Sequence, residues 1–445
     1  MTGVDYLAEA RLGTRIADVV GLRLSDLCQA EEHATGAHVE ETRRRELAEE
    51  LIDKELAVVA GEALARATAM LQPAAEARVT QWVQDRLFGH GGLDHYLRDE
   101  RVEGIDVNGH ANVWLTFADG RCEAGDRPVA ASDQDLIALV QDLVSSSGAD
   151  ARRFDVSVPS VNLQLRDGSR LFAAAYGICT VPTVSIRRHR HRRVTLDDLC
   201  ELRTVDAGLK AFLAAAVKGR LNILIAGGPA AGKTTMLRAL AAEIPYTQRV
   251  ITVEDTYELG LDQDPERRGN VTVYQTREAN TEDVGAIDMT YLMRCTLRGS
   301  PKRVIVGEVR GPEIVSMCNA MSMGIDGSLA TIHASTSAGV FDKLATYAAQ
   351  GPERMTREAT NLMVASAVNL VVLLAESRDG VRVVSSIREL TEADGPQIMS
   401  NEIWAPGVDR RARFNVYPSD HTREALAAGG FDEGWFTAEG WESPL

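Results

Sequence analysis

The sequence is poor in cysteine, in basic charge and in long apolar runs. Its six cysteines are scattered without a Cys-x-x-Cys pair, which argues against a zinc site or a disulfide framework and fits a reducing compartment. No uninterrupted apolar stretch approaches the ~18 residues of a membrane-spanning helix. The first residues lack the pattern of a secretory signal. We therefore expect a cytoplasmic protein that reaches membranes only through partners.

Basic residues are outnumbered by acidic ones, 48 against 64, and the formal net charge is −16. This balance disfavours a dominant nucleic-acid role, because the phosphates of nucleic acids are bound by clustered positive charge. We expect no nucleic-acid partner, although a local basic groove stays possible on composition alone.

The most specific motif is Gly-Gly-Pro-Ala-Ala-Gly-Lys-Thr-Thr at 227–235, between an apolar strand and a helix. It is a G-x-x-x-x-G-K-[ST] phosphate loop in its required strand–loop–helix setting. The loop backbone can turn successive N–H groups toward one anion, and the helix dipole adds positive potential. Lys233 would bind the β- and γ-phosphates of ATP, and Thr234 would ligate Mg²⁺. The predicted nucleotide-binding residues are Gly227, Gly228, Ala230, Ala231, Gly232, Lys233, Thr234 and Thr235.

Acidic residues follow two apolar strands downstream of this loop. Glu254 ends the first strand, Glu258 follows four residues later, and Glu308 ends the second strand. Because ligands of open α/β sheets bind at the carboxyl ends of strands, we expect these acids beside the phosphate loop. All three are candidates for orienting the attacking water, and Glu254 is also a candidate Mg²⁺ ligand.

The segment 327–335 is a third strand that ends in a histidine. A lone histidine is often a structural residue. At this position we predict instead that His333 senses the γ-phosphate or carries a hydrogen bond to the acidic site.

The length of the chain predicts several domains, since 445 residues are too many for one core. The first part is rich in Ala, Glu, Leu and Arg and predicts helices, the next has short strands and turns, and strands and helices then alternate. The predicted parts are a helical extension (1–88), a small α+β domain (89–187), a basic linker (188–204), a P-loop domain (205–392) and a C-terminal tail of uncertain structure (393–445).

Four boxes in this order resemble the secretion-ATPase superfamily of type II and type IV secretion, archaeal flagella and pili, above all the CpaF/TadA-type ATPases of Tad (Flp) pilus systems. They are the Walker A loop (227–235), an aspartate box (251–259), a Walker B box with its glutamate (304–311) and a histidine box (327–335). Matches before the loop are Val107-Asn108-Gly109, 167–170 and 185–188. The similarity covers about 80–390.

The resemblance implies an α/β fold, with a C-terminal RecA-like P-loop NTPase domain after a small α+β (PAS-like) domain and the helical extension. It implies a homo-oligomer, a hexameric ring, in which ATP hydrolysis moves one domain against the other. The ring would drive an inner-membrane platform protein and associate peripherally with that membrane. Nucleotide-contacting arginines are implied at Arg170, Arg187 and Arg188. Arg310, two residues after Glu308, is a further catalytic candidate, because a guanidinium there could neutralise charge on the γ-phosphate. Arg190, Arg192 and Arg193 are expected to be solvated.

Three alternatives stay open. The shared boxes also fit a conjugation-type type IV secretion ATPase that moves protein or DNA. A nucleotide-binding scaffold without hydrolysis is disfavoured by the presence of Glu308, Glu254 and His333. A RecA-like nucleic-acid motor is disfavoured by the acidic charge.

Overall fold

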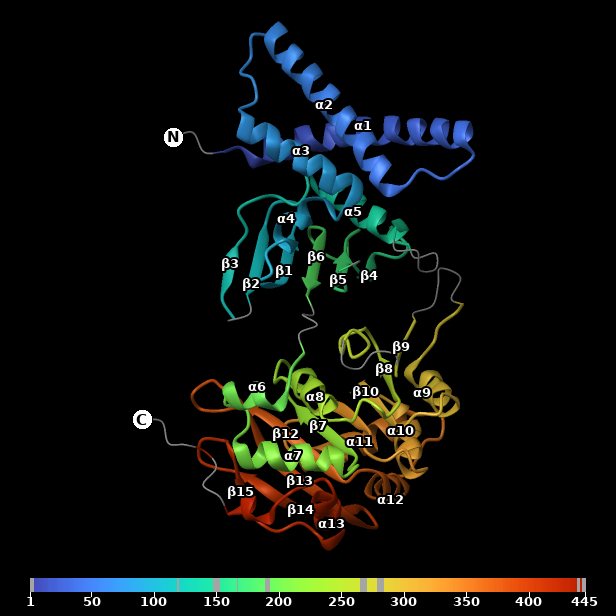
Figure 1. Ribbon diagram of the computed structural model, residues 1–445, viewed down its shortest axis with the longest axis vertical. Helices are drawn as coiled ribbons and strands as arrows, with labels where there is room; N and C mark the ends of the chain where they lie inside the picture. The colour runs from blue at the N-terminus through green and yellow to red at the C-terminus, as the bar shows by residue number, and fades with distance from the viewer. Residues whose placement is uncertain are drawn as a thin grey trace. The chain divides into compact units, whose positions relative to one another are not determined.

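The computed structural model describes residues 4–117, 120–146, 153–165, 167–188, 193–264, 270–277, 284–437 and 441. The chain forms two compact units, Met1–Arg190 and His191–Leu445 (Figure 1). Among the described residues, we find no helix with both the length and the hydropathy of a membrane span.

Three helices open the first unit, in the region predicted to be a helical extension. They are α1 (Tyr6–Thr35), α2 (Glu41–Ala65) and α3 (Pro73–Phe88). α1 ends at Gly36, whose left-handed backbone breaks the helix, and α3 begins with a proline, which is tolerated in a first helical turn. Buried apolar residues of all three helices, among them Val20, Ile52 and Val79, form one small core.

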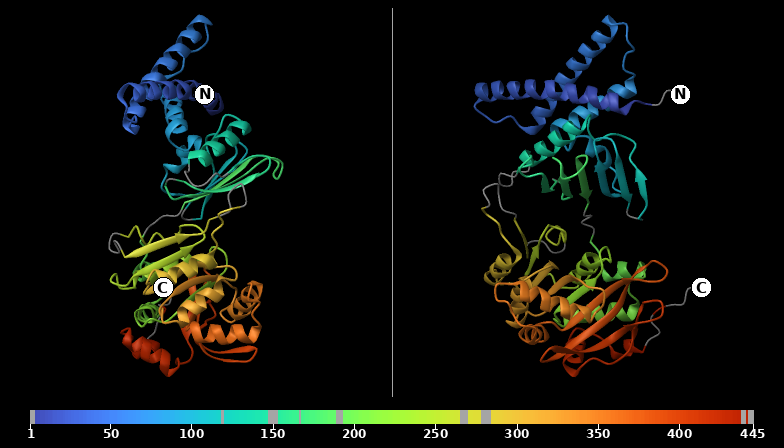
Figure 2. Two further views of the ribbon diagram at one scale, coloured as in Figure 1. Left: turned by 90° about the vertical axis from the view of Figure 1, so that its right-hand side faces the viewer. Right: turned by 180° about the vertical axis from the view of Figure 1, so that it is seen from behind.

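A six-stranded antiparallel sheet completes the first unit, in the order β3-β2-β1-β6-β5-β4. Its strands are β1 (Val102–Asn108), β2 (Val113–Phe117), β3 (Cys122–Ala124), β4 (Ser160–Gln164), β5 (Arg170–Ala174) and β6 (Thr183–Arg187), after the short helices η1 (Gly91–Leu93) and α4 (Asp94–Leu97). Helix α5 (Asp133–Ser146) packs on one face of the sheet, as the edge-on view of Figure 2 shows. β1 accordingly alternates buried residues such as Ile105 with exposed ones such as Asp106.

The second unit is built on a nine-stranded sheet, in the order β15-β14-β13-β12-β7-β11-β10-β8-β9. Six neighbouring strands of this sheet, β12, β7, β11, β10, β8 and β9, are parallel to one another. The strands β13, β14 and β15 continue the sheet beyond β12, each antiparallel to its neighbour. The strands are β7 (Ile223–Gly227), β8 (Val250–Glu254), β9 (Val271–Gln275), β10 (Arg303–Val309), β11 (Leu329–His333), β12 (Leu370–Glu376), β13 (Arg382–Asp394), β14 (Gln397–Pro406) and β15 (Ala412–Phe414). This is the α/β fold class that we predicted.

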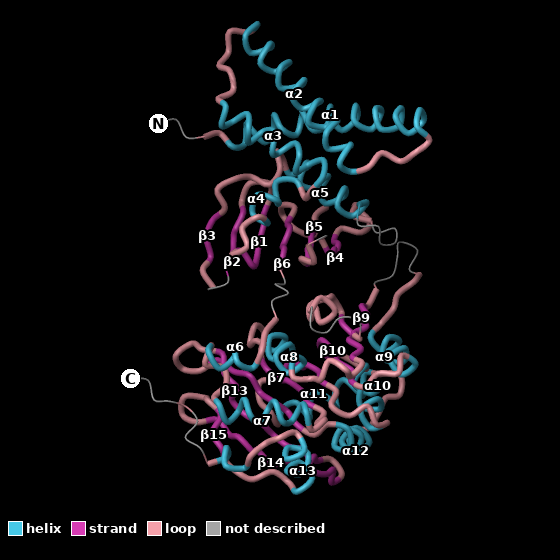
Figure 3. The backbone as a smooth tube through the Cα atoms, viewed as in Figure 1, coloured by secondary structure: helices cyan, strands magenta, loops and turns pink. Residues whose placement is uncertain are grey.

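Helices cover both faces of this sheet (Figure 3). They are α6 (Leu196–Glu201), α7 (Ala207–Lys218), α8 (Lys233–Ala242), α9 (Met289–Arg298), α10 (Glu313–Ser322), α11 (Gly339–Gln350), α12 (Arg357–Ala367), α13 (Asp420–Ala428) and η3 (Glu433–Phe436). In β7, Ile223 and Ile225 join the core that contains α7 and α8, whereas Leu224 and Ala226 join the core that contains α10. A strand covered on both faces is a continuous apolar run, which is the pattern that β7 shows in the sequence.

Two of the predicted boundaries differ from the structure. Within the predicted linker 188–204, α6 forms instead, and its Leu196 and Leu199 are buried in the core of the second unit. The predicted tail 393–445 contains β14, β15 and α13, which belong to the second unit. Trp404 holds this region by packing edge-to-face on Phe212 of α7 with ring centres 6.2 Å apart, a contact between distant residues that local patterns do not report.

Candidate nucleotide-binding site

The phosphate loop joins the carboxyl end of β7 to the first residue of α8. Gly232 precedes the helix with a left-handed backbone (φ 90°), and no side chain caps the N–H groups of the first turn. At the other end of the loop, a Cβ on Gly227 would lie 3.0 Å from the carbonyl oxygen of Leu374. Glycine is therefore favoured at both motif positions, and the uncapped helix start offers donors to an anion.

Lys233 is a mostly buried cation without a carboxylate partner. It is 8% exposed, and its Nζ donates to the Gly228 carbonyl oxygen at 2.9 Å and contacts Nδ1 of His333 at 3.1 Å. Within the part of the chain that the structure describes, no carboxylate lies within ion-pair distance of this ammonium group. Burial lowers the pKa of Lys233, so an anion bound here would relieve an unfavourable desolvated charge.

His333 links this lysine to Glu308. An ammonium group can only donate, so Nδ1 of His333 accepts from Lys233 and the ring proton of the neutral imidazole lies on Nε2. Nε2 faces Oε1 of Glu308 at 2.6 Å. Burial lowers the pKa of His333, which favours this neutral form, and the opposing effect of Glu308 is smaller. His333 therefore contacts the acidic site, and its role in sensing the γ-phosphate or in carrying a hydrogen bond to that site stays a prediction.

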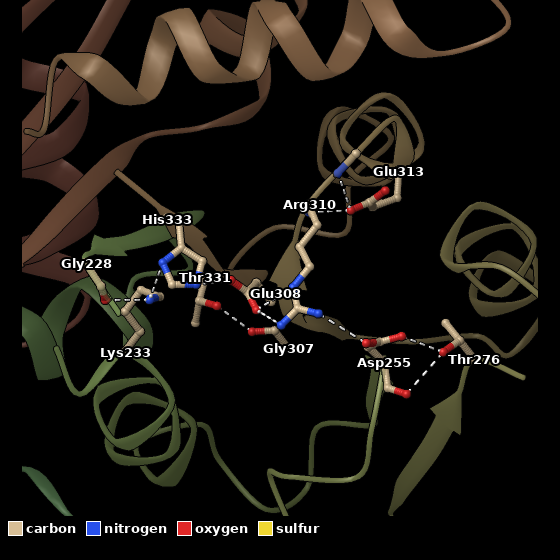
Figure 4. A network of polar contacts seen from close by, with 11 residues as sticks. Gly228, Lys233, Asp255, Thr276, Gly307, Glu308, Arg310, Glu313, Thr331 and His333 are labelled. Atoms are coloured by element: carbon tan, nitrogen blue, oxygen red, sulfur yellow. Dashed lines mark hydrogen bonds and ion pairs between the residues drawn. The ribbon is translucent and has the colours of Figure 1, made fainter. Parts of the chain in front are cut away.

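Arg310 continues the same network from the other side of Glu308 (Figure 4). Its Nε donates to Oε2 of Glu308 at 2.7 Å, and its Nη1 contacts Oδ2 of Asp255 at 3.2 Å. The register of β10 against β11 shifts between Val306 and Val309, so Glu308 sits at a bulge that re-aims its side chain. The structure thus brings Lys233, His333, Glu308 and Arg310 together.

Two residues of this network were not singled out from the sequence. Asp255 lies inside the aspartate box but was given no role, and Thr276 follows β9 without any motif. The Thr276 hydroxyl donates to Oδ1 of Asp255 at 2.8 Å, which holds the carboxylate toward Arg310. The sequence signals for Asp255 are its position after a strand and its place in the aspartate box, whereas no local signal marks Thr276.

Glu254 occupies a different environment from Glu308. It is 1% exposed, Oε1 accepts from the Thr252 hydroxyl, and Oε2 accepts from the backbone N–H groups of Glu258 and Leu259 at 2.7 and 2.8 Å. Burial raises the pKa of Glu254, and these hydrogen bonds lower it in part. This buried carboxylate already accepts three hydrogen bonds, so it is poorly suited to the metal-ligand role that we predicted. Its contacts suit it to anchoring the loop after β8.

We expect Glu254→Ala to destabilise the protein. The change leaves the buried N–H of Leu259 and the half-buried N–H of Glu258 without an acceptor. Each such group costs about 1–3 kcal/mol, so the free energy of unfolding should fall by about 2–6 kcal/mol. Denaturant unfolding of the purified protein measures this loss. Glu258→Ala is the matched control, because the backbone N–H of Glu258 remains bonded. Unchanged stability with loss of Mg²⁺-dependent turnover would restore the metal role of Glu254.

A magnesium site would rest on Thr234 and on the nucleotide. Thr234 is half-buried in the first turn of α8. Among the described residues, no group of three His, Cys, Asp or Glu side chains could hold a metal ion. Mg²⁺ commonly takes one or two protein oxygens together with phosphate oxygens and water, so a hydroxyl in the first turn after the phosphate loop fits this ion.

The remaining predicted arginines lie in the first unit. Arg170 and Arg187 are directly opposite each other on β5 and β6, so both side chains belong to one face of the sheet. Arg188 donates from Nη1 to the carbonyl oxygens of Asp99 at 2.7 Å and Val102 at 3.3 Å, a structural task within this unit. Among the three arginines that we expected to be solvated, Arg193 is exposed, and Arg190 and Arg192 lie outside the described residues.

Comparison with known proteins assigns the family. Residues 149–398, more than half of the chain, match the family described as "Type II/IV secretion system protein". A Mycobacterium tuberculosis (H37Rv) protein named "Putative conjugal transfer protein" is 30% identical over 329 residues, 72% of this chain and 90% of that protein. VirB11 of Agrobacterium fabrum is 29% identical over 311 residues, 62% of this chain and 86% of that protein.

Among solved structures, the VirB11 ATPase of the Brucella suis type IV secretion system shows 24% identity and a TM-score of 0.36, covering 66% of this chain and 94% of its own. The family assignment depends on the sequence matches. The motifs, their geometry and these matches agree on one conclusion: the chain belongs to the type II/IV secretion system protein family.

Proposed function

We propose that this protein is a Mg²⁺-dependent ATPase that powers a pilus-assembly or secretion machine. The observation that carries the proposal is the continuous polar chain from the phosphate-loop lysine through His333 to Glu308 and Arg310. A loop that only bound phosphate would not need an oriented carboxylate beside it. Release of inorganic phosphate from ATP by the purified full-length protein tests the proposal.

Each group in the network has a separate task in hydrolysis. Lys233 binds the β- and γ-phosphates. To do so, the phosphates must compete for its ammonium group with its two present partners, the carbonyl oxygen of Gly228 and Nδ1 of His333. Glu308 orients the attacking water and accepts its proton, and Nε2 of His333 lies 2.6 Å from one of its carboxylate oxygens. Arg310 balances negative charge near the γ-phosphate. Mg²⁺, when bound, neutralises charge on the β- and γ-phosphate oxygens.

The ring and its coupling are part of the same proposal. We propose a homo-hexamer at the cytoplasmic side of the inner membrane, in which the first unit presents arginines to nucleotide bound by the second unit and moves on hydrolysis. The net charge of −16 suits docking on basic cytoplasmic loops of a membrane platform.

Arg187→Ala tests the coupling. If the Arg187 guanidinium meets the γ-phosphate, turnover should fall by on the order of 10³-fold, the scale of an arginine finger, with the ring intact by light scattering. Arg187 is exposed, so its loss should not change stability, whereas Arg188→Ala should lower stability because Asp99 and Val102 lose a donor. Arg193→Ala is the control. Equally small effects of Arg187→Ala and Arg193→Ala would contradict the role of the first unit in hydrolysis.

The kind of machine has two candidates. The order and composition of the four boxes support a Tad (Flp) pilus motor. The names of the relatives from Mycobacterium tuberculosis and Agrobacterium support a conjugation-type secretion ATPase instead. Deleting the gene in its host separates the two, because loss of surface pili with normal DNA transfer supports the first and the reverse supports the second. Neighbouring pilin and prepilin peptidase genes would also favour the first.

A further inference from the structure

The hairpin between β12 and β13 lies beside the phosphate loop. β12 runs parallel to β7, and Leu374 of β12 is paired with Gly227, the first glycine of the loop. The hairpin closes just beyond, where Glu376 is paired with Arg382 (Figure 1). Apart from its chain neighbours, a Cβ placed on Gly232 would have one near neighbour among the described residues, Cδ of Arg382 at 3.6 Å. The aliphatic stem of Arg382 therefore lies against the glycine that precedes Lys233.

This hairpin is held in place by contacts outside the nucleotide site. The Ser377 N–H donates to the carbonyl oxygen of Val381 at 2.8 Å, and the Ser377 hydroxyl contacts Asp379. Nη2 of the mostly buried Arg411 binds the other carboxylate oxygen of Asp379 at 2.8 Å. Arg382 thus occupies a position that is organised before any ligand arrives, which reduces the entropy lost on binding.

The guanidinium group of Arg382 is exposed, and no hydrogen bond or ion pair joins it to another residue of the described part of the chain. It adds a further positive charge near Lys233, whose pKa is lowered by burial, raised by the charge of Glu308 and lowered by the charges of Arg310 and Lys343. A planar guanidinium with free donors beside a phosphate loop is suited to two parallel hydrogen bonds with phosphate oxygens.

Strand order shows which part of the nucleotide Arg382 can reach. β7 lies between β12 and β11, so Arg382 approaches the loop from the β12 side. His333 and Glu308, on β11 and β10, approach from the opposite side, where the γ-phosphate would react. We propose that Arg382 is a nucleotide-binding residue that holds the non-transferred α- and β-phosphates. This inference depends on the proposed function, because it requires a nucleotide in the loop.

Arg382→Ala should weaken binding of ADP and ATP alike. Loss of a charge-assisted pair of hydrogen bonds predicts a Kd increase of about 10- to 100-fold for both nucleotides, with kcat at saturating ATP unchanged within about 3-fold. Arg382→Lys keeps the charge but not the planar fork and should fall in between. Titration of the full-length protein with ADP, by calorimetry, measures Kd, and phosphate release measures kcat and KM.

Arg378→Ala is the matched control, because Arg378 is exposed on the same hairpin and its removal changes the net charge equally. Wild-type affinity in this control, together with a weakened Arg382→Ala, supports the assignment. The assignment is overturned if Arg382→Ala binds ADP as the wild type does, if both variants weaken binding equally, or if kcat falls while Kd holds. If the wild-type protein itself fails to bind ADP, the proposed function fails, which is a different result.

Discussion

Lys233→Ala is expected to abolish nucleotide turnover and to weaken ATP binding strongly. Lys233 is the one ammonium group inside the phosphate loop, 8% exposed and held toward His333. Without it, phosphate charge enters a partly desolvated loop with no compact cation, where electrostatic interactions are stronger than in water. We expect turnover at the assay background, measured by phosphate release, and a rise of on the order of 10²-fold or more in the Kd for ATP.

Lys218→Ala serves as the control for this change. Lys218 lies on α7 and pairs with Glu243 at 3.0 Å, so its removal alters the net charge equally without touching the loop. The control should keep wild-type turnover. Near-normal turnover in Lys233→Ala would overturn the assignment of Lys233 to the β- and γ-phosphates, and with it the assignment of this loop as the site of ATP hydrolysis.

Glu308→Gln should separate binding from chemistry. Glutamine keeps the size of the side chain and one oxygen that can still accept from Nε of Arg310, but its amide cannot take a proton from water. We expect kcat to fall by roughly 10²-fold or more, the usual scale for a general base, while the Kd for ATP changes little. The variant should also accumulate as an ATP-loaded oligomer.

The two constants are measured by phosphate release and by equilibrium binding of ATP. Glu243→Gln is the control, because Glu243 follows the last residue of α8 and pairs with Lys218. This variant should keep the wild-type kcat and the wild-type Kd for ATP. A parallel fall in ATP affinity and kcat would contradict the general-base role. Glu308 would then act as a Mg²⁺ ligand or a structural residue, and Glu258 would become the better candidate for the base.

The sequence alone predicts those features of this protein whose geometry depends on residues close together in the chain. The phosphate loop is readable because its glycine positions, Lys233 and Thr234 follow from the geometry of one strand–loop–helix turn. Glu308 and His333 were found because each lies at the carboxyl end of a strand, and the carboxyl ends of parallel strands share one edge of a sheet. Family membership followed from the order of these boxes along the chain.

The tertiary structure decided which of those residues meet, because that depends on strand order rather than on sequence distance. β8 and β9 bring Asp255 and Thr276 to Arg310, although 21 and 34 residues separate the members of this group. Burial and three hydrogen bonds set Glu254 apart from Glu308, a distinction that two glutamates at strand ends do not show in sequence.

Contacts between residues far apart in the chain also explain why sequence patterns did not predict β14, β15 and the position of Arg382. β14 and β15 are stabilised by packing of Trp404 against α7, about 190 residues earlier in the chain, so no short window of sequence contains both partners. Arg382 lies against Gly232 only because β12 is paired with β7 and β13 with β12 in the sheet. The sequence by itself determined the chemistry available to this protein, and the order of strands in one sheet determined which groups share a site.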